Sequence, residues 1–324
     1  MSCICSCVKI GKGETYNMRQ KPKRLNKGDT IGIISPSGPY RQGQLDKALP
    51  FIEKLGLNYK IGENCHKHWG YLAGSDEQRL EDLHTMFADP EIAGIICARG
   101  GYGAARITDK IDFDLLKNNP KILWGYSDIT FLHTAIGQKN DLVTFHGPML
   151  ASDVAGDDFA ELSAKMFEQL FEPTVLVYDE IISELHVVSE GVATAEIVGG
   201  NLSLLSNGIG TPFEIETAGK LLFIEDIGEE PYRVDCMLNQ LRQANKLDDL
   251  AGVVIGDFAD AQSTGDKPSL TLDEVFDDYF KNRAYPVMKG FKIGHCQPHF
   301  AIPLGVEAEL NTIEKTLRVF PGVH

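Results

Sequence analysis

The chain has 324 residues, enough for two domains or for one large α/β domain. Its hydrophobic fraction of 43% and charged fraction of 24% are those of an ordinary globular protein. The formal net charge of −15 at pH 7 argues against nucleic acid or an anionic membrane surface as the main partner. The sequence contains no apolar run of about 18 residues and therefore predicts no membrane span.

The first 25 residues are expected to form a disordered tail. Cys3, Cys5 and Cys7 give a C-x-C-x-C pattern, which is weak evidence for a metal site without a second pair of ligands. The tail has no small-residue cleavage site of a secretory signal, and Met18 is an alternative start. The other four cysteines are scattered, as is typical of free thiols in a reducing compartment. We therefore expect a cytoplasmic protein.

Strands and helices alternate between residues 26 and 165. The runs at 29–34 and 92–98 have the apolar composition of buried strands, and a helix is predicted over 44–55. A capping box beginning at Ser75 predicts the start of another helix. This alternation predicts a mostly parallel sheet in an N-terminal α/β domain, 26–165.

The pattern changes after residue 166. Short β-like runs follow one another without helices, and 166–190 is expected to be a linker. Glycines at 199–200 predict a turn into a helix, and an apolar strand over 220–226 follows. We predict a β-rich α/β C-terminal domain over 191–324.

Ser127 follows a predicted strand, 122–124, and precedes a helix predicted to start at Ile129. A tight strand-to-helix turn exposes a hydroxyl at the sheet edge and points the first helical N–H groups at whatever the oxygen attacks. The pattern is G-x-S-D rather than G-x-S-x-G, because Ile129 occupies the second glycine position. Serine is also a common N-cap, so a nucleophile and a helix cap are both consistent with the pattern.

A glycine-rich segment, RGGYG at 99–103, follows the strand 92–98. Glycines at a strand exit leave backbone N–H groups free to face a ligand, although a tight turn requires them equally. Because the next strand leads to Ser127, we expect the two loops to lie side by side on one sheet edge.

A nucleophilic serine requires a base, and the base requires an orienting carboxylate. His295 and His299 lie in one loop segment, and His295 directly follows a glycine. Glu225 ends a buried apolar strand, where an unpaired charge is costly, and Asp226 is its alternative. His146, which ends another strand near the site, is expected to form hydrogen bonds.

The chain contains six short motifs: RGGYG (99–103), GYSDIT (125–130), TFHGP (144–148), GGNLSLL (199–205), IEDIGEEPY (224–232) and GHCQPHFAIPLG (294–305). In order and spacing they resemble the motifs of the LD-carboxypeptidase family, serine peptidases that also include the microcin-C immunity peptidases. The resemblance extends from about residue 29 to the C-terminus and does not include the cysteine-rich tail.

The resemblance implies a Ser–Glu–His triad divided between two domains. Ser127 matches the nucleophile, Glu225 the carboxylate and His295 the base. His299 falls in a variable part of its motif and ranks second. The resemblance also implies a homodimer and no metal or cofactor.

The resemblance further implies an oxyanion hole formed by the backbone N–H groups of Gly101 and Asp128, with Gly100 as the alternative to Gly101. Members of the carboxypeptidase type release the terminal D-alanine from cytoplasmic tetrapeptides recycled from the cell wall. We therefore expect a serine LD-carboxypeptidase with a muropeptide substrate. The candidate substrate contacts are Arg99, as a clamp for the free carboxylate, and more weakly Tyr102, Asn201 and Arg233.

Two other functions remain open. An immunity peptidase that cleaves an aminoacyl or peptidyl nucleotide would share the triad, but the compact segment 199–216 favours the carboxypeptidase. A non-catalytic protein would instead hold an anion or a peptide at 99–103, beside a helix that Ser127 caps. The sequence lacks a G-x-G-x-x-G or P-loop pattern, which weakens nucleotide versions of this alternative.

Overall fold

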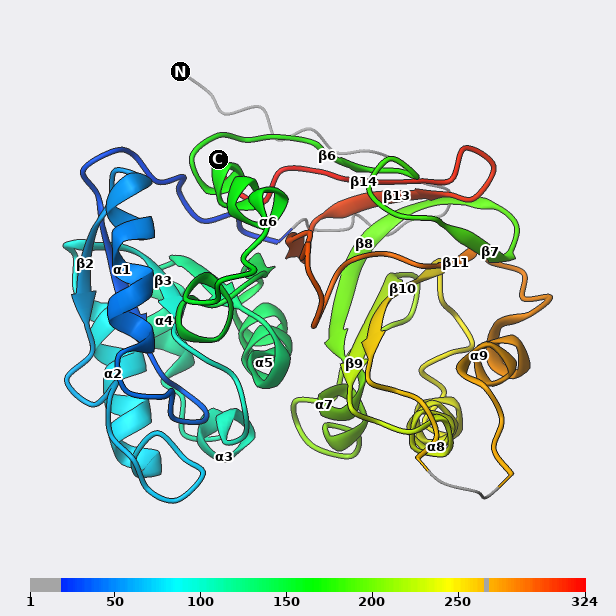
Figure 1. Ribbon diagram of the computed structural model, residues 1–324, viewed down its shortest axis with the longest axis horizontal. Coiled ribbons are helices and arrows are strands. Elements are labelled where there is room, and N and C mark those ends of the chain that lie inside the picture. The colour runs from blue at the N-terminus through cyan, green and yellow to red at the C-terminus, as the bar shows by residue number, and fades with distance from the viewer. Residues whose placement is uncertain (1–18, 265–267) are drawn as a thin grey trace.

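Two β-sheets, each flanked by helices, form the centres of two lobes (Figure 1). The computed structural model describes residues 19–264 and 268–324. In these residues one sheet has six strands, in the order β12-β5-β4-β3-β1-β2. The other has eight, in the order β6-β14-β13-β8-β9-β10-β11-β7. The predicted combination of a mostly parallel N-terminal sheet with a β-rich C-terminal part is confirmed.

The first sheet is parallel except at one edge. Its strands are β1 (Thr30–Ile34), β2 (Asn58–Ile61), β3 (Ile92–Cys97), β4 (Ile122–Gly125), β5 (Thr144–His146) and β12 (Ile302–Leu304). The last of these comes from near the C-terminus and pairs antiparallel with β5. The central strands β3 and β4 are apolar throughout, as is usual where helices cover both faces of a sheet.

The helices of the first lobe are α1 (Gln44–Lys54), α2 (Asp76–Ala88), α3 (Ala104–Thr108), α4 (Phe113–Asn118), α5 (Thr130–Asn140) and α6 (Glu161–Lys165). Helix α2 begins at the predicted capping box, in which Ser75 and Gln78 bond reciprocally. Helix α1 continues through Pro50. Two short helical segments, η2 (Leu150–Val154) and η3 (Met166–Leu170), complete this lobe.

The second sheet is parallel over β8–β11 and antiparallel elsewhere. Its strands are β6 (Leu176–Tyr178), β7 (His186–Ser189), β8 (Val192–Asn201), β9 (Leu221–Ile227), β10 (Gly252–Ala259), β11 (Val287–Lys289), β13 (Glu307–Asn311) and β14 (Thr316–Val319). Helices α7 (Leu202–Asn207), α8 (Pro231–Gln243) and α9 (Leu272–Phe280) flank β9 and β10 in Figure 1. The segment 166–190 contributes β6 and β7 to this sheet.

The glycine turn predicted at 199–200 does not form. Gly199 and Gly200 continue β8 with φ values of 138° and 140°. A Cβ atom on Gly199 would lie 1.8 Å from the carbonyl oxygen of Phe223, and one on Gly200 would lie 2.5 Å from Oγ1 of Thr130. Glycine therefore lets β8 approach both β9 and the start of α5.

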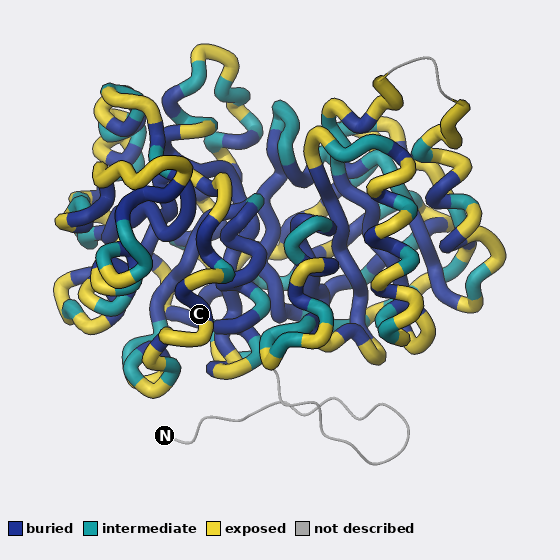
Figure 2. Tube along the Cα trace, turned by 90° about the horizontal axis from the view of Figure 1, so that it is seen from below, coloured by how far each residue is buried: buried dark blue, intermediate teal, exposed yellow. Residues whose placement is uncertain are grey.

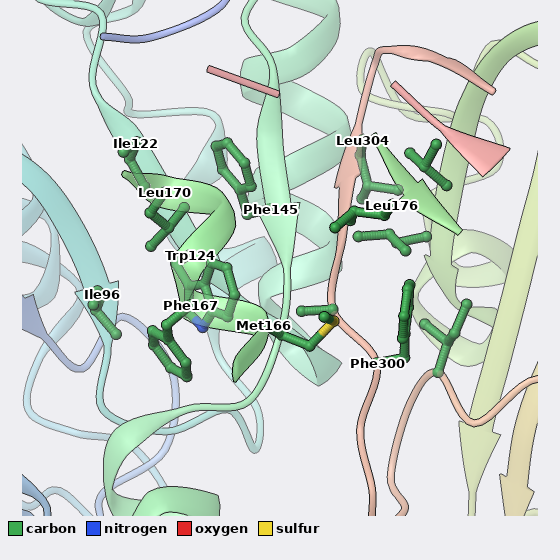
Figure 3. Packing of buried hydrophobic residues seen from close by; sticks show 14 of the residues in the cluster. Ile96, Ile122, Trp124, Phe145, Met166, Phe167, Leu170, Leu176, Phe300 and Leu304 are labelled. Atoms are coloured by element: carbon green, nitrogen blue, oxygen red, sulfur yellow. The ribbon is translucent and has the colours of Figure 1, made fainter. Parts of the chain in front are cut away.

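A buried aromatic cluster supports the strand that leads to Ser127 (Figure 3). The Trp124 ring lies 4.4 Å from that of Phe167 and 6.1 Å from that of Phe145. Its Nε1–H donates to the carbonyl of Pro148 at 2.7 Å. Burying an indole while satisfying its polar atom anchors β4 strongly. Figure 2 shows buried strands inside and most exposed residues over the outer helices and loops.

The residues that precede β1 also pack against both lobes. The guanidinium Nε of Arg19 lies 2.7 Å from Oε1 of Glu196, and the N–H of Leu25 donates to Leu170. The C-x-C-x-C tract lies outside the described residues. Among the helices in the described ranges, none combines the length and apolar composition that a membrane crossing requires.

Candidate active site

Ser127 lies at a strained turn immediately after β4. Its φ of 61° is in the left-handed region, which non-glycine residues rarely occupy. The chain passes from β4 into a short 3-10 turn, η1 (Ser127–Ile129), and then into α5. The N-cap positions belong to Tyr126 and Ile129, and neither makes a side-chain capping bond. Ser127 is therefore not an N-cap, and its hydroxyl is not used to cap the helix that follows.

The two loops lie side by side, as predicted. A Cβ atom built on Gly100 would lie 3.0 Å from Cβ and 3.2 Å from Oγ of Ser127. Gly101 has a φ of 105° and is exposed, whereas Gly100 is buried. In the described part of the chain the N–H of Gly101 donates to no protein acceptor. Gly101 therefore has a backbone N–H without a protein partner in the loop next to Ser127.

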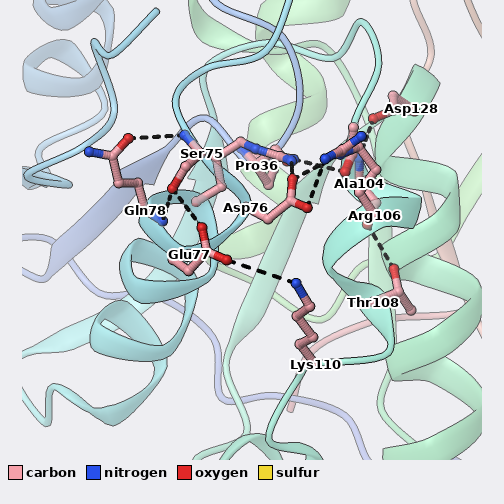
Figure 4. Close-up of polar contacts among 12 residues, drawn as sticks. Pro36, Ser75, Asp76, Glu77, Gln78, Ala104, Arg106, Thr108, Lys110 and Asp128 are labelled. Carbon is pink, nitrogen blue, oxygen red and sulfur yellow. Dashed lines mark hydrogen bonds and ion pairs between the residues drawn. The ribbon is translucent and has the colours of Figure 1, made fainter. Parts of the chain in front are cut away.

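A buried arginine joins the loops around Ser127. Arg79 is 1% exposed, and its Nη1 donates to the carbonyls of Pro36 and Gly103 at 2.5 and 2.8 Å. Asp76 lies 2.5 Å from Nη2 of Arg79 and also binds Arg106 (Figure 4). This network holds the loop after β1 against the loop after β3. Nothing in the local sequence identified Arg79, because its partners are backbone carbonyls distant along the chain.

Asp128 connects the serine turn to the glycine loop. Its Oδ2 accepts the N–H of Ala104, the first residue of α3, at 2.8 Å (Figure 4). Burial raises the pKa of this carboxyl, although its hydrogen bonds oppose that effect. The side chain of Asp128 thus ties the serine turn to the start of α3, directly after the glycine loop.

The second lobe supplies an imidazole–carboxylate pair. Glu225 on β9 is fully buried, and its Oε2 lies 2.7 Å from Nδ1 of His295. A Cβ atom on Gly294 would lie 2.6 Å from this oxygen, so the glycine lets the loop approach the strand. Burial by itself lowers the pKa of His295, but the charge and hydrogen bond of Glu225 outweigh it and raise the pKa above its usual value. Burial acts to raise the pKa of Glu225, but His295 and His146 hold it at about 2.

The serine turn and this pair meet where the lobes adjoin. The Tyr126 ring, immediately before Ser127, lies 4.7 Å from the His295 ring. The N–H of Asn201 donates to Oγ1 of Thr130 at 3.0 Å, and Asn201 pairs in register with Glu225. The predicted nucleophile, base and carboxylate are therefore brought to one region from three distant parts of the sequence.

The two alternative residues are placed differently. Asp226 accepts bonds from Asn201 and from the backbone and side chain of Ser203, because neighbouring strand residues point to opposite faces. His299 is fully buried, and burial lowers its pKa well below the usual value. The geometry favours Glu225 and His295.

The weaker substrate candidates differ in availability. Arg99 is exposed, and its guanidinium donates to the carbonyl of Pro39. Tyr102 is 50% exposed and packs at 62° against Tyr71, with the ring centroids 5.7 Å apart. Asn201 is buried, and its amide bonds to Asp226 and caps α7. Arg233 is exposed and pairs with Glu229.

Comparisons with known proteins match both lobes of the chain to one family. A family model described as the LD-carboxypeptidase N-terminal domain matches residues 31–147, and its C-terminal counterpart matches 194–310. The chain is 51% identical to the probable murein peptide carboxypeptidase of Bacillus subtilis, over 95% of this chain and 97% of the relative.

Two solved structures are also similar. One is a muramoyltetrapeptide carboxypeptidase from Oxalobacter formigenes, with a TM-score of 0.78 and 26% identity over 90% of this chain and 97% of that one. The other is the microcin C7 self-immunity protein MccF with aspartyl sulfamoyl adenosine, with a TM-score of 0.85 and 24% identity over 93% and 98%. At that identity, the second likeness concerns the fold alone.

Proposed function

The chain belongs to the LD-carboxypeptidase family, and we propose that it is a serine carboxypeptidase that releases the terminal D-alanine from cell-wall-derived tetrapeptides. The observation that carries the proposal is the 2.7 Å bond between His295 and Glu225 beside the strained turn at Ser127. The 51% identity to a probable murein peptide carboxypeptidase supports the substrate class.

In the proposed reaction His295 removes the proton from Ser127 as its oxygen attacks the L,D-peptide carbonyl. Glu225 accepts the Nδ1–H bond and so selects the tautomer whose Nε2 is free to take that proton. The N–H groups of Gly101 and Asp128 stabilise the oxyanion. The imidazolium then protonates the departing D-alanine amine, and water hydrolyses the acyl-enzyme with the same base.

The test of the function is a substrate panel. We expect the protein to release D-alanine from tetrapeptides with L-lysine or diaminopimelate at the third position. Mass spectrometry measures the release. An L-alanine-terminated tetrapeptide is the stereochemical control, and an aminoacyl sulfamoyl nucleotide tests the immunity-peptidase alternative. Turnover of the nucleotide without turnover of either tetrapeptide would contradict the carboxypeptidase assignment.

We expect the pH dependence to report the Glu225–His295 pair. His295 acts as a base only when neutral, and its pKa is raised, so kcat/KM falls as pH drops through a value above 6.5. In Glu225→Gln the charge is lost while burial remains. The acid limb of the pH profile, which is the fall in kcat/KM at low pH, then moves to lower pH. We expect kcat to fall about 10⁴-fold, as in a comparable triad.

The control for this experiment is Asp226→Asn, which removes a neighbouring charge that does not bond to His295. The charge of Asp226 contributes less than that of Glu225 to the raised pKa of His295, so the acid limb is expected to move down by less than in Glu225→Gln. An unchanged acid limb in Glu225→Gln would show that Glu225 does not set the protonation of the base.

Arg99 is proposed to bind the free carboxylate of the terminal D-alanine. Arg99→Gln is expected to raise KM about tenfold with little change in kcat, because one charge-assisted hydrogen bond is lost. A substrate with a C-terminal amide should show no such difference between the two enzymes. Arg318→Gln is the matched control, because Arg318 is an exposed arginine on β14 that pairs with Glu309. An equal loss on both substrates would assign Arg99 a structural role only.

A further inference from the structure

One oxygen of the buried Glu225 carboxylate is not used by His295. Oε2 bonds to Nδ1 of His295, whereas Oε1 has no hydrogen-bond partner among the described residues. Nε2 of His146 lies 3.7 Å from Oε1, about 0.5 Å beyond hydrogen-bond range. A buried carboxylate oxygen without a donor is costly, so a small closure of this gap is favourable.

His146 is suited to this bond. It ends β5 and is fully buried, and both ring nitrogens lack partners within the described ranges. Its ring packs at 83° against the ring of Phe223, which lies two residues before Glu225 on β9, with centroids 5.0 Å apart. On its other side the Tyr126 ring lies 5.6 Å away. Packing thus orients the imidazole, and Glu225 is the anion it faces.

The other titratable groups around the pair do not replace this bond. Burial lowers the pKa of His133 to about 3 and that of His299 well below its usual value, so both are neutral. Asp226 bonds to Ser203 instead, and Asp153 bonds to the hydroxyl of Tyr126 at 2.8 Å.

We propose that His146 is a positioning residue whose Nε2–H donates to Oε1 of Glu225, so that the carboxylate is held between two imidazoles. His146 belongs to the first lobe and Glu225 to the second, so the bond aligns the carboxylate with the lobe that carries Ser127. The inference rests on the proposed function for its catalytic consequence, but the bond itself is independent of the substrate.

The test compares His146→Leu, which has no donor, with His146→Gln, whose amide places a donor near the Nε2 position. In His146→Leu we expect kcat to fall about 10- to 100-fold with KM little changed, the effect of losing one hydrogen bond to a charged group. Without a donor at Oε1, the Glu225 carboxylate keeps more negative charge at Oε2 and stabilises the protonated form of His295. The pKa of His295 therefore rises, and the acid limb of kcat/KM moves to higher pH. His146→Gln should restore most of kcat and return the acid limb.

His299→Leu is the matched control, because it empties a buried imidazole site in the same cluster without removing a bond to Glu225. Proton NMR of the His295 Nδ1–H needs no substrate and is therefore informative even if the tetrapeptides are not cleaved. We expect the chemical shift of this resonance and the titration of His295 to change in His146→Leu. Both should remain as in the wild type in His299→Leu and His146→Gln. The proposal is overturned if His146→Leu leaves both unchanged, or if both leucine variants change them equally.

Discussion

Replacing Ser127 by alanine is expected to lower kcat on the tetrapeptide by about 10⁶-fold, the usual cost of losing a serine nucleophile. The reason is that the Ser127 hydroxyl is the proposed nucleophile, whereas the neighbouring Tyr126 hydroxyl donates to Asp153 at 2.8 Å. A fluorophosphonate probe should label the wild type and fail to label this variant. Ser206 donates its hydroxyl to Gln240 on α8, and the control variant Ser206→Ala should be labelled like the wild type.

The fold should survive the loss of Ser127. Alanine keeps the strain of the φ value of 61°, whereas Ser127→Gly relieves about 1 kcal/mol of it. Ser127→Gly should therefore be inactive and melt no lower than the wild type. Wild-type turnover by either variant would falsify the assignment of the nucleophile, and absence of labelling in the wild type would favour a binding protein.

Replacing His295 by alanine should be as damaging as replacing Ser127, again by about 10⁶-fold in kcat. Nδ1 of His295 bonds to Glu225, whereas His299 is fully buried and neither of its ring nitrogens has a hydrogen-bond partner among the described residues. The variant also leaves Glu225 without its bonded partner, so stability at neutral pH should fall, because a buried charge loses its compensation.

His299→Ala is the control for this prediction. It removes packing against Tyr126 and His146, so it should destabilise the protein while keeping much more activity than His295→Ala. Melting temperatures measured alongside kcat separate the two effects. If His299→Ala is the less active of the two, the base has been wrongly assigned.

Much of the candidate site could be predicted from short stretches of sequence. The capping box at Ser75 and the strand that ends at Gly125 depend on residues within one or two turns of each other, so local chemistry determines them. The adjacency of the 99–103 loop and Ser127 follows from consecutive parallel strands. The family motifs supplied the residue identities beyond this local logic.

Other features depend on contacts between distant segments. Gly199 and Gly200 read locally as a turn, but the close approach of Phe223 and Thr130 makes them part of β8. Arg79 binds carbonyls from two loops, and no spacing rule identifies such partners. The sequence placed His146 at a strand end near the site, but only the fold shows that it lies opposite Glu225.

The amino-acid sequence by itself determined the order of the elements and the serine turn, because propensity and capping act over a few residues. The candidate triad came from the resemblance of its motifs to those of the LD-carboxypeptidase family. Only the tertiary structure decided that Glu225 rather than Asp226 faces His295, and that β12 joins the first sheet next to His146. The physical reason is that side-chain direction and lobe contacts are set by strand register and close packing across the whole chain.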